Sequence, residues 1–443
     1  MKREHLKSAM YIFAVVFFAA GICRSQTENN VGNSTTEVIS DSLTMEQAVR
    51  IALDHQPLLR SAEASVRSAS SSVTQAQSNY FPSLSLNASG TRTGGAFVFN
   101  PSFPARTQFY NNYSTGASLQ QTIYDFGKTG GRVSASEDLY SASSFDYNST
   151  RDNVMMNVEL AYIAFVQAQR LVGVDEEAVK QAEDHLKEAQ AFYKVGSRPQ
   201  FDVTKSEVDL ANANVNLISA RNQVRIAKVQ LENAMGVHPT QVYAVQNTFD
   251  TTSFAMPLDS AKVIALESRP EVSAAEARVR ANQALASAAW DQNLPSLALS
   301  GSYTWNGFDF PLVSRWTGGI TLSVPLFQGF NVEAQVQQAE ANADAAQASL
   351  DLLKESVRLD VEQNYLSLKE AGERIGASAK LVAQAEENLK LAEGRYNSGV
   401  GSPIEITDAQ VTLSNARITY IQALADYNSS LIRLQKAMGI IGK

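Results

Sequence analysis

The sequence predicts a mixed fold, in which a membrane β-barrel with four strands from each chain continues into a long α-helical coiled coil, and this unit is written twice. Three observations lead to the prediction. The chain matches itself over most of its length, each half contains a heptad pattern of about 67 residues, and four short segments alternate between apolar and small polar residues.

The internal repeat is clearest in two phrases, "YKVGSRPQFDVTKSEV" from Tyr193 and "YNSGVGSPIEITDAQV" from Tyr396, which begin 203 residues apart. Upstream segments match at an offset of 213, so ten extra residues must lie in the first half. We place them in a loop at 91–114, which is rich in Gly, Pro, Asn and aromatic residues.

The repeat predicts a signal peptide at 1–25, a first repeat at 26–237, a linker at 238–257 and a second repeat at 258–443. The first repeat should hold strands at about 83–123 and a long hairpin at about 127–236 with its tip at 194–200. The second should hold strands at about 296–326 and a hairpin at about 330–438 with its tip at 397–403.

The N-terminus has the layout of a secretory signal, with a basic start followed by the apolar stretch "AMYIFAVVFFAAGI" and cleavage near Ser25. The only cysteine, Cys23, is either discarded with this signal or is the lipidated first residue of the mature chain. Ile22 stands where a lipid-anchor site prefers a small residue, which favours the first alternative. In both cases the mature chain forms no disulfide.

Charge and histidine usage exclude several functions. The chain carries 37 Lys and Arg against 45 Asp and Glu, and this acidic balance argues against nucleic acid as a partner. The four histidines are scattered without the spacing of metal ligands, and no nucleophile with a neighbouring base is visible. We therefore expect no metal, no cofactor and no enzymatic activity. The histidines are His5, His55, His185 and His238.

In each repeat a helix of about 25 residues comes first, at 57–80 and at 270–292, and the alternating segments follow. These segments are "SLSLNAS" (83–89), "YSTGASLQQTI" (113–123), "SLALSGSYTW" (296–305) and "WTGGITLSVPL" (316–326). Small polar residues on one face and apolar residues on the other are typical of outer-membrane strands, although a solvated hairpin on a core alternates in the same way.

Four strands cannot close a barrel in lipid, where every backbone group needs a partner. Eight strands from two chains would be filled by side chains, whereas twelve strands from three chains close around a usable lumen. The strands therefore predict a homotrimer in contact with outer-membrane lipid.

The long helical patterns predict coiled-coil seams with one large and one mostly small residue per heptad, which favours close helix approach. The first seam contains Val158, Phe165, Val172, Val179, Leu186 and Tyr193, each of the first five followed three residues later by Ala161, Ala168, Asp175, Ala182 and Ala189. The second contains Val361, Leu368, Ile375, Val382, Leu389 and Tyr396, with Asn364, Ala371, Ser378, Ala385 and Ala392. The returning helices carry Phe201, Val208, Val215 and Val229, and Ile404, Val411, Ile418 and Ile432.

The two repeated phrases mark the turns between long helices. Gly196 and Gly399 suit the position after a helix end where φ is positive. Pro199 and Pro403 suit the first turn of the returning helix. The phrases therefore predict the tips of two long helical hairpins.

The order and double occurrence of the motifs, over residues 43–440, resemble the TolC-like outer-membrane efflux proteins. The motifs are "TIYDFG" and "VPLFQGF" between strand and helix, the tip phrases, and the closing "LENAMGV" and "LQKAMGI". The resemblance implies a trimeric exit duct of a tripartite efflux or type I secretion system, which passively conducts substrates to the exterior. It also implies a location in the outer membrane extending into the periplasm, with a periplasmic adaptor (membrane fusion) protein and an inner-membrane pump as partners.

The resemblance further implies a periplasmic gate closed by the second hairpin. Tyr396 should bond Asp202, and Glu405 and Asp408 should form an acidic ring in the narrow mouth. A basic residue often found in the inner tip of this family is here Gly401, and either Arg198 or Arg395 is a candidate to replace it. The adaptor-docking tips would be Gly196, Ser197, Arg198 and Pro199, and Gly399, Val400, Gly401, Ser402 and Pro403.

Structural roles remain open for all of these residues. Tyr396 lies on the predicted seam, where packing alone explains an aromatic residue. Glu405 and Asp408 lie near a helix N-terminus, where carboxylates complement the helix dipole, and any helical hairpin needs tip glycines and prolines. The alternative function for the whole chain is a periplasmic or surface structural coiled-coil protein without channel activity.

Overall fold

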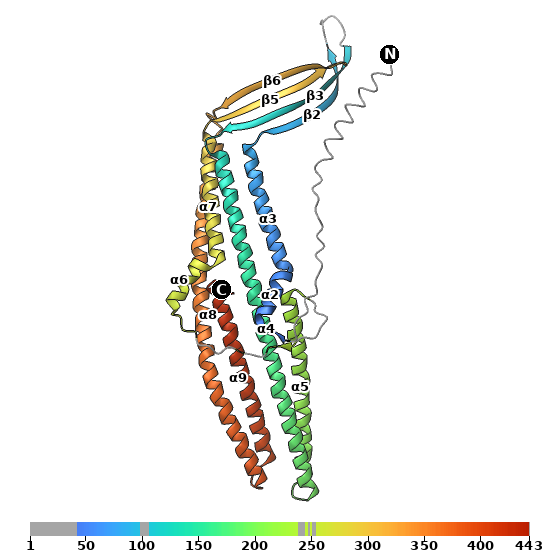
Figure 1. Cartoon of the computed structure of the whole chain (residues 1–443), viewed down its shortest axis with the longest axis vertical. Coiled ribbons are helices and arrows are strands. Elements are labelled where there is room, and N and C mark those ends of the chain that lie inside the picture. The colour runs from blue at the N-terminus through green and yellow to red at the C-terminus, as the bar shows by residue number, and fades with distance from the viewer. Residues whose placement is uncertain (1–41, 98–105, 238–243, 247–248, 250–253, 443) are drawn as a thin grey trace, which may run out of the picture. The chain divides into compact units, whose positions relative to one another are not determined.

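The structure, a computed structural model, describes residues 42–97, 106–237, 244–246, 249 and 254–442. The predicted signal peptide, with Cys23, and most of the predicted linker lie outside the described residues. The elements come in the following order (Figure 1): β1 Ser42–Leu43, α2 Met45–His55, α3 Pro57–Gln77, η1 Ser78–Tyr80, β2 Ser83–Phe97, β3 Arg106–Tyr124, α4 Lys128–Lys194, α5 Gln200–Met235, β4 Ala244–Val245, α6 Leu258–Ser268, α7 Pro270–Trp290, η2 Asp291–Asn293, β5 Ser296–Gly307, β6 Val313–Ser323, α8 Asn331–Asn397 and α9 Pro403–Ala437.

The four long strands form one antiparallel sheet in the order β2-β3-β5-β6. Strands β3 and β5 come from different repeats and pair at the centre, with Ala117 opposite Tyr303. Strands β2 and β6 are left at the two edges without a partner in the described chain. A sheet from both repeats is therefore assembled within one chain, and both of its edges stay open.

The prediction of a loop at 91–114 is wrong for most of this range, because β2 continues to Phe97 and β3 begins at Arg106. The glycines that suggested a loop are accommodated in the ladder. A Cβ on Gly94 would lie 2.5 Å from the ring of Phe109, which covers the bare backbone opposite it. The extra residues of the first repeat therefore lengthen a β-hairpin.

The helical hairpins, α4–α5 and α8–α9, are each built on a helix of 67 residues, which corresponds to about 100 Å. In each connection from strand to helix, the two residues before the helix are left-handed. Phe126 and Gly127 have φ of 58° and 116°, and Gly329 and Phe330 have φ of 63° and 65°. The motifs "TIYDFG" and "VPLFQGF" are thus the sharp turns from strand to helix, and each long helix runs from the sheet to a hairpin tip.

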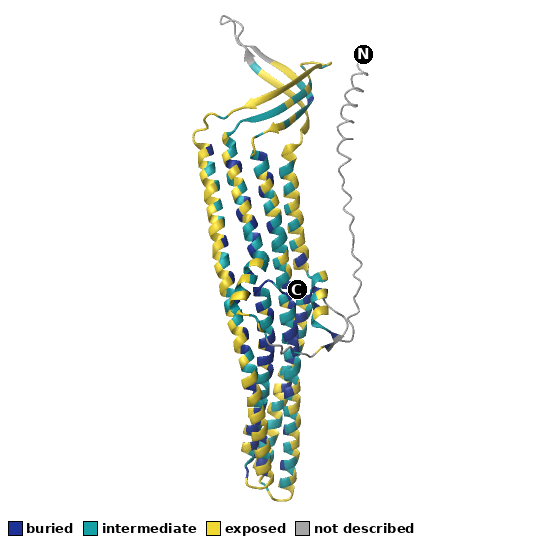
Figure 2. Ribbon diagram, turned by 60° about the vertical axis from the view of Figure 1, so that its left-hand side comes forward, coloured by how far each residue is buried: buried dark blue, intermediate teal, exposed yellow. Residues whose placement is uncertain are grey.

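The seam predicted for α8 is largely buried, including Val361, Leu368, Leu389 and Tyr396, and Figure 2 shows buried residues along the facing sides of the helices. In α4 the seam is less buried at the tip, where Tyr193 is 46% exposed in the single chain. The positions on the returning helices are also mostly exposed in the single chain: Phe201, Val208, Val215, Val229, Ile404 and Val411.

The two repeats use the same joint where a short helix meets the end of a returning helix. Gln56 Nε2 donates to Ala234 O at 2.9 Å, and Arg269 Nη1 donates to Ala437 O at 3.5 Å and to Asp360 Oδ2 at 2.7 Å. Gly236, with φ of 71°, ends α5 so close to the chain that a Cβ would lie 2.9 Å from Gln56 Cα. The repeated "AMG" motif therefore closes this joint.

Among the described helices, none combines the length and the apolar character that a membrane-spanning helix requires.

Candidate functional site

The candidate site is the pair of helical tips, where α4 turns into α5 and α8 turns into α9. Gly196 and Gly399 have φ of 71° and 80°, and a Cβ at either position would meet no atom within 4 Å. The left-handed backbone, not crowding, therefore selects glycine here. Val195 and Val400 beside them are exposed, so each tip presents an apolar side chain to its surroundings.

The returning helices start differently. Pro199 is the N-cap of α5 and lies one residue before the helix, whereas Pro403 occupies the first turn of α9 as predicted. Ser402 caps α9 and Glu405 reaches back to its backbone, which completes a capping box. The tip of α8–α9 is therefore the more tightly organised of the two.

Gly401 has a steric reason to be glycine. A Cβ at this position would lie 2.7 Å from the backbone nitrogen of Tyr396 and 2.9 Å from the carbonyl carbon of Arg395. Backbone atoms cannot move aside as a flexible side chain can. The turn thus leaves no room for the basic residue that the resemblance led us to look for at this place.

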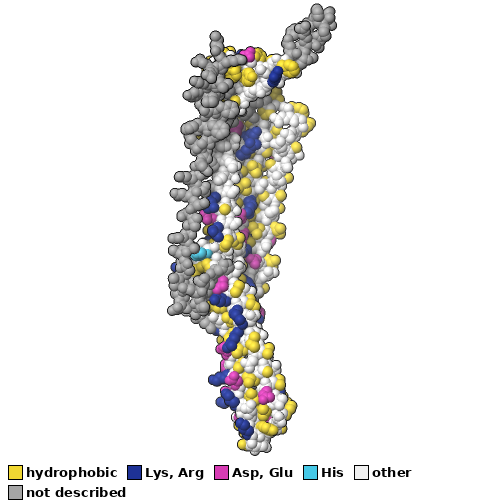
Figure 3. All heavy atoms as spheres, turned by 90° about the vertical axis from the view of Figure 1, so that its right-hand side faces the viewer, with side chains coloured by type: hydrophobic (Ala, Val, Ile, Leu, Met, Phe, Trp, Pro, Cys, Tyr) yellow, Lys and Arg dark blue, Asp and Glu magenta, His cyan; other side chains and the backbone are white. Residues whose placement is uncertain are grey.

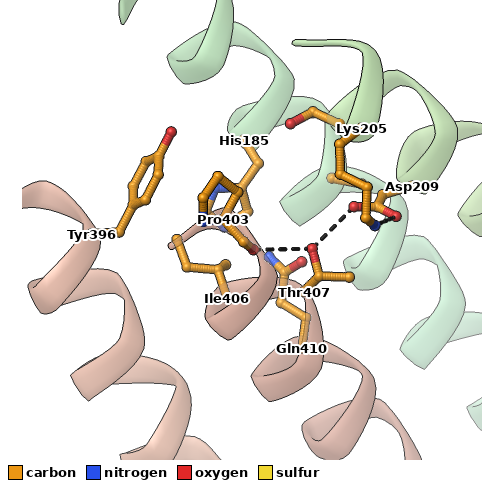
Figure 4. A pocket seen from close by; sticks show the side chains of 10 residues that line it. His185, Lys205, Asp209, Tyr396, Pro403, Ile406, Thr407 and Gln410 are labelled. Atoms are coloured by element: carbon orange, nitrogen blue, oxygen red, sulfur yellow. Dashed lines mark hydrogen bonds and ion pairs between the residues drawn. The ribbon is translucent and has the colours of Figure 1, made fainter. Parts of the chain in front are cut away.

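Tyr396 is the central side chain between the two hairpins and is only 4% exposed (Figure 4). Its ring meets Phe192 of α4 edge to face, with the centroids 6.0 Å apart. Burial raises the pKa of the Tyr396 hydroxyl, and the charges of Asp202 and Glu188 raise it further, while Arg198 lowers it. The hydroxyl therefore stays protonated and is a hydrogen-bond donor at neutral pH.

Asp202, in the first turn of α5, is 5% exposed, and its Oδ2 has no hydrogen-bond partner among the described residues. Its charge acts on Tyr396, so the structure brings the two predicted residues into one neighbourhood. No hydrogen bond joins them in the described chain. A buried carboxylate oxygen without a partner is costly, and the Tyr396 hydroxyl, on which the charge of Asp202 acts, is the donor that we expect it to take.

Arg198 and Arg395 have different partners. Arg198 donates from Nη2 to the carbonyl of Gly401 at 3.4 Å, and its guanidinium lies 4.8 Å from the centre of the Tyr396 ring. Arg395 pairs with Glu405 of its own hairpin at 3.0 Å. Arg198 therefore connects the two hairpins, and Arg395 does not.

Glu405 and Asp408 are both exposed and lie three residues apart near the start of α9. The hydrogen bond from Arg395 is the main cause that lowers the pKa of Glu405, and the backbone N–H of Ser402 adds to it. The carboxylate of Asp408 has no hydrogen bond or ion pair within the described residues. Both groups are thus available as negative charges at the tip.

Two further connections between the hairpins were not predicted from the sequence. Thr407 Oγ1 of α9 donates to Asp209 Oδ2 of α5 at 3.0 Å, and Lys205 pairs with the same carboxylate (Figure 4). Arg417 of α9 pairs with Glu177 of α4 at 2.6 Å and with Glu386 of α8 at 3.0 Å. Thr407 has an identical counterpart in the first repeat, Thr204, but its partner Asp209 does not, and neither do Arg417 and Glu177, so the internal comparison gave no signal for these pairs.

A cleft of about 470 Å³ lies between α4 and the second hairpin close to the tips. It is lined by Gln181, Asp184, His185, Glu188, Glu393, Asn397, Ile406 and Gln410. The described residues contain no group of three His, Cys, Asp or Glu placed to hold a metal ion.

Comparisons with known proteins agree with this architecture. The sequence model of one family, described as outer membrane efflux protein, matches residues 48–237 and 263–440. The outer membrane protein TolC of Escherichia coli (strain K12) is 23% identical over 424 residues, which covers 91% of this chain and 84% of that protein. The fold resembles the crystal structures of CusC (TM-score 0.80, 19% identity, 89% of this chain and 92% of that one) and of a membrane protein from Pseudomonas aeruginosa (TM-score 0.78, 22% identity, 89% and 93%). The fold class predicted from the sequence is confirmed.

Proposed function

Because this chain belongs to the outer membrane efflux protein family, we propose that three copies of it form the exit duct of a tripartite efflux or type I secretion system in the outer membrane. The observation that carries the proposal is the four-stranded sheet with open edges at β2 and β6. Lipid tolerates no unpaired strand edge. Three copies joined edge to edge give twelve strands and a closed barrel, which satisfies both edges.

Exposed apolar residues along the helices support association of the chains. On α5 they are Phe201, Val208, Val215, Ile218, Ile226 and Val229, and on α8 they are Leu352, Leu359, Leu366, Leu381 and Leu391. Figure 3 shows hydrophobic side chains interspersed with charged ones along one face of the helices. Spacings of seven residues recur in both sets, as in coiled-coil seams. We infer that these stripes pack against neighbouring chains and continue the barrel into a helical tunnel.

The proposed duct is passive, and the described residues contain no group of three His, Cys, Asp or Glu placed to hold a metal ion. An inner-membrane pump supplies the driving force, and a periplasmic adaptor docks onto the tips. Val195 and Val400, exposed beside the left-handed glycines, give each tip an apolar contact for the adaptor. The sheet would lie in the lipid of the outer membrane, and the long helices would lie in the aqueous periplasm.

The tips act as the gate. Three sets of contacts hold the second hairpin to the first. Arg198 contacts Gly401 and the ring of Tyr396. Thr407 donates a hydrogen bond to Asp209, and Arg417 forms an ion pair with Glu177. Moving the second hairpin away breaks these contacts and opens the mouth. Three copies each of Glu405 and Asp408 then place up to six carboxylates around that mouth, which favours cations.

The alternative is a structural coiled-coil protein without channel activity. Carbonate extraction of membranes, followed by native mass measurement in mild detergent, tests the duct against it. We expect the protein to stay in the carbonate-resistant membrane fraction and to purify as a trimer. Release by carbonate, or a monomer or dimer in mild detergent, would contradict barrel closure and favour the structural alternative.

A further inference from the structure

One face of the sheet is lined by small uncharged groups. Ser85 and Ser118 share a hydrogen bond at 2.7 Å, and so do Ser302 and Thr317. Together with neighbouring serines, glycines and Gln120, these residues surround a hollow of about 440 Å³. The opposite face carries Leu84, Leu86, Trp316 and Ile320 in exposed positions. Polar groups inward and apolar groups outward make the serine-lined face the wall of the lumen.

A single charge lies on that wall. Arg315 is two residues from Thr317 on β6, so both point to the same face, and Arg315 pairs with Thr304 of β5. The row continues through Gly116 to Asn87. Over Ser83–Gly95, Phe109–Tyr124, β5 and β6, no other charged residue shares this face, and the four strands contain no Asp, Glu or Lys.

The other two strand arginines are placed differently. Arg92 alternates with the serines of β2 and so lies on the apolar face, where its guanidinium is 5.2 Å from the centre of the Phe109 ring. Arg106 pairs with Phe97 at the far end of the β2–β3 ladder, beyond Tyr113 and Gly307, where β3 and β5 cease to pair. The four-stranded wall therefore contains Arg315 but not Arg106.

The guanidinium of Arg315 makes no hydrogen bond or ion pair with the described residues, whereas its backbone belongs to the β5–β6 ladder. The nearest acidic residue in sequence is Asp309, which lies exposed in the turn between β5 and β6. A charge in an open turn is screened by salt within about 8 Å. A charge held against the low-dielectric wall of a lumen is screened much less. The field inside the barrel at this level is therefore set by Arg315.

We propose that three Arg315 side chains form an anion-binding ring at the outer end of the lumen, which makes the duct suited to cargo that bears carboxylate or phosphate groups. This inference rests on the trimeric duct proposed above. The guanidinium fork matches planar carboxylates and phosphate oxygens in two-point contacts. In the same row, on the far side of Thr304, Gly116 has no side chain, and a Cβ there would lie 2.5 Å from Tyr303 O. Such cargo would meet acidic groups at the tips and basic groups at the exit.

The test measures ion selectivity and anion block of the purified full-length protein in planar bilayers. The background carries Glu405→Gln and Asp408→Asn, so that the acidic tips do not mask the ring. In a KCl gradient we expect this channel to prefer chloride, and pyrophosphate added on the outer side to reduce the current. Arg315→Ser should abolish the preference and raise the blocking concentration of pyrophosphate about tenfold.

Matched variants identify the cause. Arg92→Ser removes an arginine from the opposite face of the same sheet and should behave like the background, whereas Arg315→Lys should keep the preference for chloride. Asp309→Asn should leave or strengthen it. An unchanged reversal potential and unchanged pyrophosphate block in Arg315→Ser would overturn the ring while leaving the duct intact. Release of the background protein from membranes by carbonate, or its purification as a monomer or dimer, would overturn the duct and the ring together.

Discussion

The guanidinium of Arg198, at the tip of the first hairpin, lies 4.8 Å from the centre of the Tyr396 ring, on the second hairpin. The same side chain donates to the carbonyl of Gly401. The two hairpins are therefore joined by a cation over an aromatic ring and by a hydrogen bond to backbone. Gly401, which leaves no space for a basic side chain of its own, accepts a hydrogen bond through its carbonyl from Arg198 of the other tip.

This relationship predicts that Arg198 stabilises the closed gate. Arg198→Gln removes the charge over the ring, and the loss of a cation–π contact and a charged hydrogen bond is worth about 1–3 kcal/mol per chain. We expect a higher conductance in planar bilayers. Arg395→Gln, which loses only an ion pair within one hairpin, is the matched control and should have the smaller effect. Equal conductance of Arg198→Gln and wild type would exclude this closing contact.

Tyr396→Phe should also raise conductance, and more so when combined with Asp202→Ala. The change keeps the packing against Phe192 but removes the hydroxyl that we expect to donate to the unpartnered Asp202 carboxylate when the trimer is closed, and such a bond to a charged group is worth about 1.5–3 kcal/mol. Single-channel recordings of the single and double variants measure this. Wild-type conductance in both would leave Tyr396 with a packing role only.

The acidic ring predicts a change in selectivity. Glu405→Gln combined with Asp408→Asn removes two negative charges per chain, and the reversal potential in a KCl gradient should shift away from cation preference. Both side chains are exposed, so trimer assembly should not change. Unaltered selectivity would mean that these carboxylates do not line the constriction.

We expect docking of the adaptor to depend on the shape of the tips. Gly399→Val forces a β-branched residue into a φ of 80° and should distort the turn. Export in cells should fall while trimer level and membrane insertion stay normal. Gly376→Ala, at a helical position with no atom within 4 Å of the new Cβ, is the control. Loss of the trimer in Gly399→Val would show that the tip is needed for assembly instead.

Glu159 predicts a pH dependence of stability. This residue of α4 lies beside Tyr162 and Gln246 in a cavity of about 480 Å³, and burial raises its pKa from 4.5 to about 7. Between about pH 4.5 and pH 7, Glu159 is therefore protonated in the folded state and ionised in the unfolded state. The contribution to the free energy of unfolding is fully present below about pH 4.5 and is lost as the pH rises to about 7.

Glu159→Gln keeps a neutral side chain at every pH, so it should unfold at a higher temperature than wild type at pH 8 and show little difference at pH 4.5. We expect about 1–2 kcal/mol per chain at pH 8, below the full value of the shift because solvent partly screens the half-buried carboxylate. Thermal unfolding of the detergent-solubilised protein at both pH values measures this. Glu46→Gln, which neutralises an exposed carboxylate of the same cavity, is the control. A pH-independent difference between Glu159→Gln and wild type would rule out titration of Glu159.

Local sequence periodicity determined much of this protein. The heptads predicted two long hairpins, the alternation predicted the strands, and the glycines predicted both tips, because each of these signals depends on neighbours within one helix turn or one strand. The candidate gate residues Tyr396, Asp202, Glu405 and Asp408 came from the resemblance to the TolC-like family, matched onto the tip phrases. Their positions followed from the sequence, although their contacts did not.

Only the tertiary structure decided which contacts the two hairpins make with each other. Tyr193 and Tyr396 occupy the same place in the repeat, yet one is exposed and the other is buried against Phe192. The bridge from Arg198 to Gly401 and the pairing of Arg417 with Glu177 depend on how one hairpin is rotated and shifted along the other. No local periodicity encodes that rotation, since it results from packing between segments about 200 residues apart in the chain.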